Sequence, residues 1–193
     1  MKTIDYYNLH AEQFADSTFQ VDMESLYQPF LALLQPSARI LDVGCGSGRD
    51  SLAFKNKGYE VEAMDYSEEL VKKATELTGI AVKHQSFYEL DEVQAYDGVW
   101  ACASLLHCER ERLHEVFEKL VTALRSGGVL YMSFKYGDSD REKDGRYFTD
   151  LNEPQAEKLL GQVGQVELLR QWITVDQRPD RVEKWLNILV KKE

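Results

Sequence analysis

The stretch "ILDVGCGSGRDS", residues Ile40 to Ser51, places three glycines at alternate positions directly after a short apolar run. This pattern is typical of a buried parallel strand that runs into a turn, where glycine lets a ligand approach the backbone because no Cβ stands in the way. The dinucleotide fingerprint GxGxxG requires a glycine where Arg49 stands, and the phosphate loop requires a lysine directly after Gly48. The stretch therefore predicts a ligand turn that fits neither NAD nor a nucleoside triphosphate well.

Length and composition favour one soluble globular domain: 193 residues, 44% hydrophobic and 29% charged. The net charge of −10 opposes binding to nucleic acid or to an anionic membrane surface, so we expect a small-molecule partner and neither nucleic acid nor membrane. No apolar run suits a membrane helix, and the N-terminal residues lack a signal-peptide segment, so a cytoplasmic location is expected. Three cysteines without CxxC spacing predict neither disulfides nor a metal site. A monomer and a homodimer both remain open.

Strand and helix patterns alternate along the chain. They predict an α/β fold with a Rossmann-like, seven-stranded, mostly parallel sheet, a C-terminal antiparallel hairpin and helices on both faces. Such sheets bind ligands at the carboxyl ends of their strands. The expected strands are residues 39–43, 59–65, 80–85, 96–104 and 127–135, with the hairpin formed by 165–177 and 181–192. The expected helices are residues 4–17, 22–34, 49–57, 68–78 and 109–125, with one more after Pro154 and a polar loop over 136–152.

The sequence from Asp42 to Gly48, "DVGCGSG", resembles motif I of the class I S-adenosylmethionine-dependent methyltransferases, an acidic residue followed by GxGxG after the first strand. The resemblance continues at Asp65, which ends the second predicted strand, and at the pair Ser86–Phe87 after the third. It extends through "YDGVWACASLLH", residues 96–107, and "LRSGGVLYMSFK", residues 124–135. The similarity spans about residues 38–135 and is of the small-molecule type.

This resemblance implies S-adenosylmethionine as cofactor, with S-adenosylhomocysteine as product, and direct in-line transfer of the methyl group. The glycine loop would wrap the methionine part, Asp42 would reach its ammonium group, and Asp65 would accept hydrogen bonds from both ribose hydroxyls. Ser86 and Phe87 would hold and flank the adenine. The full set of cofactor residues that it implies is Asp42, Gly44, Cys45, Gly46, Gly48, Asp65, Tyr66, Ser67, Ser86, Phe87 and Ala103.

The whole chain is expected to be a single methyltransferase domain, with cap helices over residues 1–36, a cofactor core over 37–135 and a substrate loop and hairpin over 136–193. His107, just beyond the fourth strand, is the candidate that takes or steers a proton, or else an imidazole that fixes the loop. The candidate substrate residues are Tyr6, Tyr7, Lys135, Arg146 and Tyr147. If Lys135 and Arg146 converge, an anionic acceptor is expected. We interpret Arg178 and Arg181 as solvated charges beside a turn.

Three alternatives remain open. Tyr131 and Lys135 spell the YxxxK pair of short-chain dehydrogenases, but residues four apart lie about 13 Å apart on a strand, against about 6 Å on a helix. An NAD-dependent oxidoreductase is therefore disfavoured. An RNA methyltransferase, acting on tRNA for example, is disfavoured because the chain has neither the Pro-Pro motif of amino-group enzymes nor a Pro-Cys pair. A non-catalytic module that only binds S-adenosylmethionine is not excluded.

Overall fold

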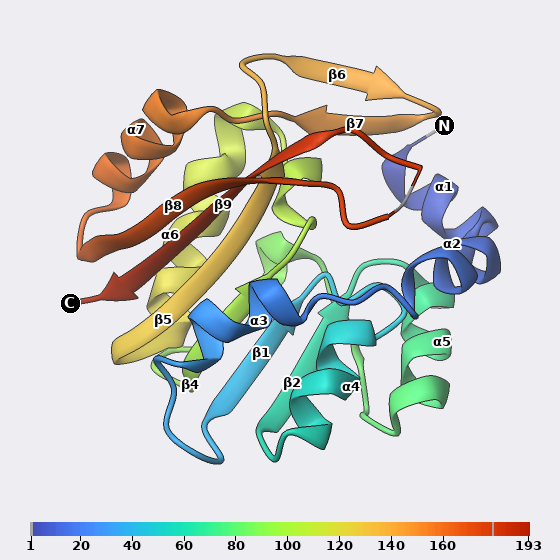
Figure 1. Cartoon of the computed structure of the whole chain (residues 1–193), viewed down its shortest axis with the longest axis horizontal. Helices are drawn as coiled ribbons and strands as arrows, with labels where there is room; N and C mark the ends of the chain where they lie inside the picture. The colour runs from blue at the N-terminus through green and yellow to red at the C-terminus, as the bar shows by residue number, and fades with distance from the viewer. Residues whose placement is uncertain (1, 179) are drawn as a thin grey trace.

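A seven-stranded sheet runs through the molecule in the order β3-β2-β1-β4-β5-β9-β8 (Figure 1). The structure is a computed structural model that describes residues 2–178 and 180–193. Strands β1 to β5 are parallel, and β9 pairs antiparallel with both β5 and β8. The predicted α/β fold and its terminal hairpin are confirmed. The strands are β1 (Arg39–Val43), β2 (Glu60–Asp65), β3 (Lys83–His84), β4 (Tyr96–Ala101), β5 (Leu124–Lys135), β8 (Val166–Val175) and β9 (Lys184–Lys192).

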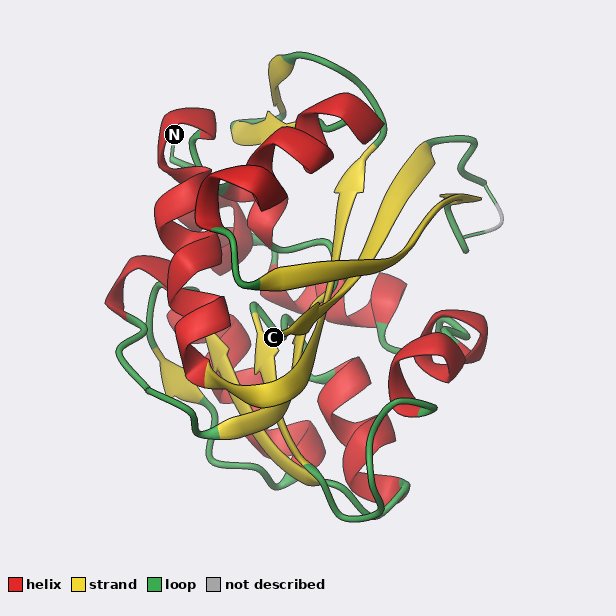
Figure 2. Cartoon of the chain, turned by 90° about the vertical axis from the view of Figure 1, so that its left-hand side faces the viewer, coloured by secondary structure: helices red, strands yellow, loops and turns green. Residues whose placement is uncertain are grey.

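Helices cover both faces of this sheet (Figure 2). Side chains alternate between the faces along each strand: on β1, Ile40 packs with α3 and α4, whereas Leu41 and Val43 pack with α6 and α7. Within the described residues no helix is both long enough and apolar enough to cross a membrane. The helices are α1 (Thr3–Leu9), α2 (Ala11–Thr18), α3 (Glu24–Leu31), α4 (Arg49–Asn56), α5 (Glu68–Thr78), α6 (Leu113–Ala123) and α7 (Glu153–Val163), with short 3-10 turns η1 (Phe87–Glu89), η2 (Leu105–His107) and η3 (Arg110–Arg112).

The expected polar loop over residues 136–152 is wrong, because it contains a second, two-stranded sheet of β6 (Asp140–Lys143) and β7 (Arg146–Thr149). Asp144 and Gly145 connect these strands, and both have positive φ, 53° and 76°. An Asp-Gly pair with two positive φ values matches the tight two-residue turns of hairpins. The charged sequence of β6 hides this pattern. The backbone N–H of Tyr147 donates to Thr3 Oγ1 at 2.9 Å, so the hairpin lies beside α1.

The predicted first helix is two helices, because α1 and α2 are separate elements that meet at His10. The predicted cap of α5 is confirmed: Ser67 Oγ accepts from the backbone N–H of Leu70 at 3.2 Å, and the helix ends at Gly79. Predicted strand three shrinks to two residues at the sheet edge. Tyr131 and Lys135 both lie on β5, so they cannot form a helical YxxxK pair.

A buried carboxylate at the start of α4 joins three elements. Asp50 accepts hydrogen bonds from Tyr27 Oη of α3 at 2.6 Å, from Trp100 Nε1 of β4 at 2.8 Å and from Arg49 Nε at 2.6 Å. Burial acts to raise the pKa of Asp50, but the charge of Arg49 and these three hydrogen bonds outweigh it, and the net shift is downward. Trp100 in turn stacks on Tyr131, with 3.9 Å between ring centroids. This network fixes the end of the glycine loop against the sheet.

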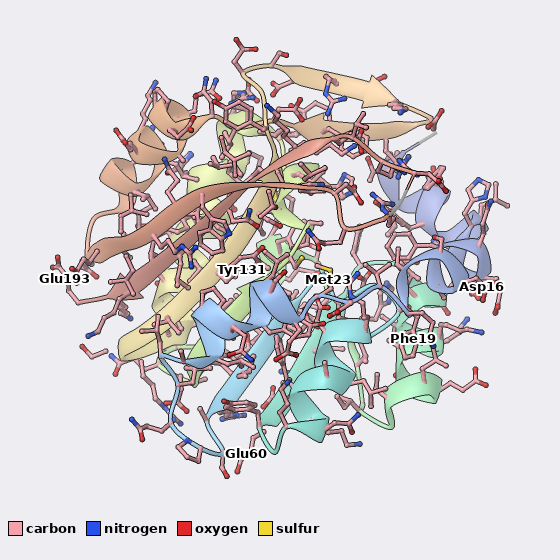
Figure 3. All side chains as sticks on the ribbon, in the orientation of Figure 1. Asp16, Phe19, Met23, Glu60, Tyr131 and Glu193 are labelled. Atoms are coloured by element: carbon pink, nitrogen blue, oxygen red, sulfur yellow. The ribbon has the colours of Figure 1, made fainter. Side chains whose placement is uncertain are left out.

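We predict that Asp50→Ala destabilises the protein by about 3 to 5 kcal/mol, because it leaves the Arg49 charge without its carboxylate and two buried donors without an acceptor. Urea unfolding measures the loss. Asp16→Ala is the control. Asp16 is exposed on α2 at the edge of the molecule, whereas Tyr131, on which Trp100 of the network stacks, lies near the middle (Figure 3). The control should stay within about 0.5 kcal/mol of the parent. A loss below about 1 kcal/mol for Asp50→Ala would show that the network is not important for stability.

Candidate functional site

A cavity of about 450 Å³ opens at the carboxyl ends of β1, β4 and β5. One wall is the glycine loop after β1, and α1 and α2 form the opposite wall. The turn between β6 and β7 and the facing ends of β8 and β9 close the remaining side. This is the edge of the sheet at which the fold is expected to bind a ligand.

The three alternate glycines serve two purposes. All three have positive φ, a backbone conformation that other residues adopt at a cost. A Cβ on Gly44 would lie 2.5 Å from Ser104 Cβ, and one on Gly48 would lie 2.6 Å from Thr78 Cγ2. These two glycines therefore let the loop pack closely against the chain itself. Gly46 lies on the cavity wall and packs closely against Phe14 of α2, since a Cβ on Gly46 would lie 3.0 Å from the Phe14 ring.

Asp42 lies behind the loop and not on the cavity wall. Ser51 Oγ donates to its carboxyl at 2.6 Å. Burial, together with the neighbouring charge of Asp50, raises the pKa of Asp42 to about 8, which holds the carboxyl largely protonated at neutral pH. The predicted contact of Asp42 with an ammonium group stays a prediction, and in this arrangement its side chain supports α4.

Asp65, at the end of β2, is positioned by the loop itself. Its two carboxylate oxygens accept from the backbone N–H of Gly46 at 2.9 Å and of Ser67 at 2.8 Å. Burial raises the pKa of Asp65 to about 6, although these backbone hydrogen bonds oppose the shift. Each carboxylate oxygen can accept a second hydrogen bond, so Asp65 keeps capacity for two hydroxyl donors.

Four other predicted cofactor residues, Tyr66, Ser67, Ser86 and Phe87, lie outside the cavity wall. Tyr66 is 52% exposed. The Ser67 hydroxyl donates to the side-chain oxygen of Asn8 at 2.7 Å, so α1 covers this part of the surface. The ring of Phe87 packs toward Gly44. Of the predicted cofactor set, Gly44, Cys45, Gly46 and Ala103 lie on the cavity wall.

Tyr7 and His107 form a hydrogen-bonded pair on the cavity wall. His107 Nδ1 lies 2.7 Å from the carbonyl oxygen of Tyr147, which can only accept, so Nδ1 carries the proton. Nε2 is then free to accept from the hydroxyl of Tyr7 at 2.8 Å. Burial lowers the pKa of His107 to about 4, and the positive charges of Arg146 and Lys135 act in the same direction. His107 is therefore neutral at pH 7, and it also ties β7 to the loop after β4.

Basic side chains gather at the other end of the cavity. Lys135 pairs with Glu183 at 2.7 Å, and Arg178 pairs with Asp176 at 2.6 Å. Both Arg178 and Arg181 lie on the cavity wall. Arg181 is exposed, as its interpretation as a solvated charge expects, whereas the side chain of Arg178 is only 28% exposed. Strands β8 and β9 carry their connecting segment over the end of the sheet, and sequence spacing does not reveal this. The predicted substrate residues Tyr6, Tyr7, Lys135 and Arg146 also line the cavity, whereas Tyr147 contributes a carbonyl to His107.

Sequence reasoning missed Ser47 and Asp50, both of which line the cavity. The Ser47 hydroxyl is buried, and no group among residues 2–178 and 180–193 forms a hydrogen bond with it. Ser47 lies inside the glycine motif, so its position was a usable signal. Asp50 gave no signal, because its partners Tyr27 and Trp100 are distant in the sequence.

Comparison with known proteins places these features in a family. Residues 40–128 match a family model described as a methyltransferase domain. The ubiquinone biosynthesis O-methyltransferase of Xanthomonas campestris is 33% identical over 106 residues, which cover 51% of this chain and 43% of that protein. The chain spans about half the length of the curated relatives that it matches.

Solved structures share the whole fold at low sequence identity. The 1,6-didemethyltoxoflavin-N1-methyltransferase of Burkholderia thailandensis, solved with 1,6-didemethyltoxoflavin and S-adenosylhomocysteine, superposes with a TM-score of 0.79 at 22% identity, covering 98% of this chain and 84% of that one. The cyclase SpnF also gives a TM-score of 0.79, at 14% identity, covering 99% of this chain and 96% of its own. A shared fold therefore does not fix the reaction. Residues 40–128 are therefore similar to a methyltransferase domain, and the chain has the fold of the class I methyltransferases.

Proposed function

We propose that the chain transfers a methyl group from S-adenosylmethionine to a small-molecule acceptor bound in the cavity. The observation that carries this proposal is the continuity of the cavity, which joins the glycine loop to the Tyr7–His107 pair in one space. The methyltransferase domain and the S-adenosylhomocysteine bound by the Burkholderia thailandensis neighbour support the choice of cofactor. The ubiquinone and toxoflavin relatives support a small-molecule acceptor.

The residues around the loop fit this cofactor. Asp65 has acceptor capacity left for two ribose hydroxyls, and the buried Ser47 hydroxyl lacks a protein partner among the described residues. Gly44, Cys45 and Gly46 of the loop line the cavity. When bound, S-adenosylmethionine supplies a methyl group on a positively charged sulfur. The carboxylate of Asp65 near the loop is compatible with a cationic ligand, whereas a phosphate would be repelled.

At the acceptor end, the protein has to orient the acceptor, exclude water and take up a proton. Helices α1 and α2 form one wall of the cavity, where they would limit the access of solvent to a bound acceptor. An acceptor hydroxyl or amine placed at Tyr7 can give its proton to this tyrosine while Tyr7 passes its own proton to His107 Nε2. With a pKa of about 4, His107 is a weak base. It suits a proton that leaves while the methyl group is being transferred, as the acceptor atom becomes more acidic.

A labelling experiment tests the proposed function. The full chain is incubated with S-adenosylmethionine tritiated at its methyl group and with separate fractions of a cell extract: small molecules, RNA and protein. We expect label in the small-molecule fraction only. Label in RNA would favour a tRNA methyltransferase instead, and binding of S-adenosylmethionine without any labelled product would identify a non-catalytic module.

We predict that Asp65→Asn weakens S-adenosylhomocysteine binding by ten-fold or more, because hydrogen bonds to a charged acceptor are worth about 1.5 to 3 kcal/mol. In the parent protein the ionised carboxylate binds, so affinity should fall as pH decreases through about 6, the pKa of Asp65. Asp65→Asn should show no such dependence. Calorimetric titration at several pH values measures both effects.

The control for this variant is Asp91→Asn, since Asp91 is exposed and distant from the cavity wall. It should bind S-adenosylhomocysteine as the parent does. Equal affinity of Asp65→Asn and the parent at pH 7 would rule out Asp65 as a ribose ligand.

We predict that Tyr7→Phe and His107→Gln each lower kcat by about 10²-fold to 10⁴-fold, the usual contribution of a positioned proton acceptor. The affinity for S-adenosylhomocysteine should change less than about two-fold in either variant, since neither side chain belongs to the proposed cofactor set. If the two act as one unit, the double variant should be no slower than the slower single variant.

The rate of label transfer from S-adenosylmethionine to the small-molecule fraction provides the measurement. Tyr59→Phe, which removes a hydroxyl outside the cavity wall, is the control. Full activity of both single variants would leave the Tyr7–His107 pair a purely structural contact. A multiplicative loss in the double variant would contradict a shared proton path.

A further inference from the structure

The cavity wall has an excess of positive charge although the protein as a whole is acidic. Its net charge is −10, but six basic side chains and three acidic ones line the cavity. The basic residues are Arg49, Lys135, Lys143, Arg146, Arg178 and Arg181, and the acidic ones are Asp50, Asp144 and Asp176. This local excess is the opposite of what a neutral or cationic acceptor would favour.

Contacts within the protein divide these cations into two groups. Three of them are held by carboxylates at 2.6 to 2.7 Å: Arg49 by Asp50, Lys135 by Glu183 and Arg178 by Asp176. The other three lack a close carboxylate: Arg181 lies 3.8 Å from Glu183, and no carboxylate among the described residues lies within 4.0 Å of Lys143. Arg146 is the least exposed of these three, and its nearest carboxylate is that of Asp144 at 3.5 Å, which is 60% exposed. An exposed pair at this distance compensates little of the charge of Arg146.

Aromatic rings hold Arg146 in place. Its guanidinium carbon lies 4.2 Å from the centroid of the Tyr6 ring and 5.3 Å from that of Phe148. The side chain is only 19% exposed, and its buried Nε has no acceptor among the described residues. Stacked arginine side chains keep their N–H donors in the plane of the group, where they match the two oxygens of a carboxylate or phosphate.

Arg146 is also close to the proposed proton acceptor. The ring of Phe148, which the guanidinium approaches, lies 5.0 Å from the imidazole of His107, and Tyr6 lies edge-on to Tyr7 at 5.5 Å. Burial raises the pKa of Tyr7 and lowers that of His107, and the charge of Arg146 opposes the first shift and adds to the second, so the three groups share one electrostatic environment. A ligand at Arg146 is therefore within reach of the Tyr7–His107 pair.

We propose that the methyl acceptor is an anion whose carboxylate or phosphate binds Arg146 while its reacting atom lies at the Tyr7–His107 pair. This inference rests on the proposed methyltransferase function and adds the chemical class of the substrate. It also assigns a specificity-determining role to Arg146. An anion beside Arg146 offsets the positive charge that disfavours protonation of His107, so a bound acceptor increases the basicity of the group that receives its proton.

The test measures binding without turnover. The full chain is saturated with S-adenosylhomocysteine and titrated with four flat probes of similar size: benzoate, phenyl phosphate, benzamide and benzylamine. Nuclear magnetic resonance of the arginine Nε–Hε groups reports on Arg146 directly. We expect benzoate or phenyl phosphate to shift the Arg146 signal and to bind at least ten-fold more tightly than benzamide, with benzylamine binding most weakly. The tighter of the two anions separates a carboxylate site from a phosphate site.

Two arginine variants complete the test. Arg146→Met should remove the preference for anions, and Arg146→Lys, which keeps the charge without the planar fork, should retain part of it. Arg170→Met is the matched control, since it removes the same charge from an exposed position on β8 outside the cavity and should keep the full preference.

The outcomes separate the two proposals. If S-adenosylhomocysteine does not bind, the proposed function fails. If it binds but benzamide binds as tightly as benzoate and phenyl phosphate, only the proposal of an anionic acceptor is overturned. The same holds if no probe shifts the Arg146 signal. An equal loss of anion preference in Arg170→Met would attribute the effect to net charge and would also overturn it. If Arg146→Met unfolds, the Lys variant and the direct signal in the parent still decide.

Discussion

The buried carboxylate of Asp50 is the constraint on which the site depends. It lies beside the glycine loop and holds α3 through Tyr27, β4 through Trp100 and the first turn of α4 through Arg49. A buried charge is tolerated only when donors surround it, so these contacts form together or not at all. The loop can then adopt three positive φ values and pack closely against its neighbours. Arg49 stands where a dinucleotide fold has its third glycine, and its role is to neutralise Asp50.

Charge is distributed unevenly along the cavity. At the loop end Arg49 neutralises Asp50, and the carboxylate of Asp65 beside Gly46 suits a cofactor that carries positive charge on its sulfur and its amino group. Basic side chains from β5, β7 and the segment between β8 and β9 occupy the opposite end, and Arg146 is the least exposed of those that have no close carboxylate. The neutral His107 lies between the two ends. A cationic donor and an anionic acceptor would each meet the complementary charge, and they would meet each other at the Tyr7–His107 pair.

Much of the fold could be predicted from local patterns, because strands, caps and turns are set by residues close in the sequence. The run from Ile40 to Gly48 identified β1 and its loop, and Ser67 with Gly79 bounded α5. The hairpin of β6 and β7 was missed because β6 is charged on both faces and only the pair Asp144–Gly145 indicates a turn. A ligand turn and the candidate residue His107 were also predictable. The contacts of His107, the wall position of Arg178 and the role of Asp50 were not, since each depends on elements that meet only in the folded chain.

A crystal structure of the chain with S-adenosylhomocysteine tests most directly whether donor and acceptor share one cavity. The homocysteine part should lie along Gly44 to Ser47, with the ribose hydroxyls on Asp65 and the sulfur facing the Tyr7–His107 pair across open cavity space. A ligand bound elsewhere, or one whose sulfur is separated from Tyr7 and His107 by protein, would contradict methyl transfer in this cavity.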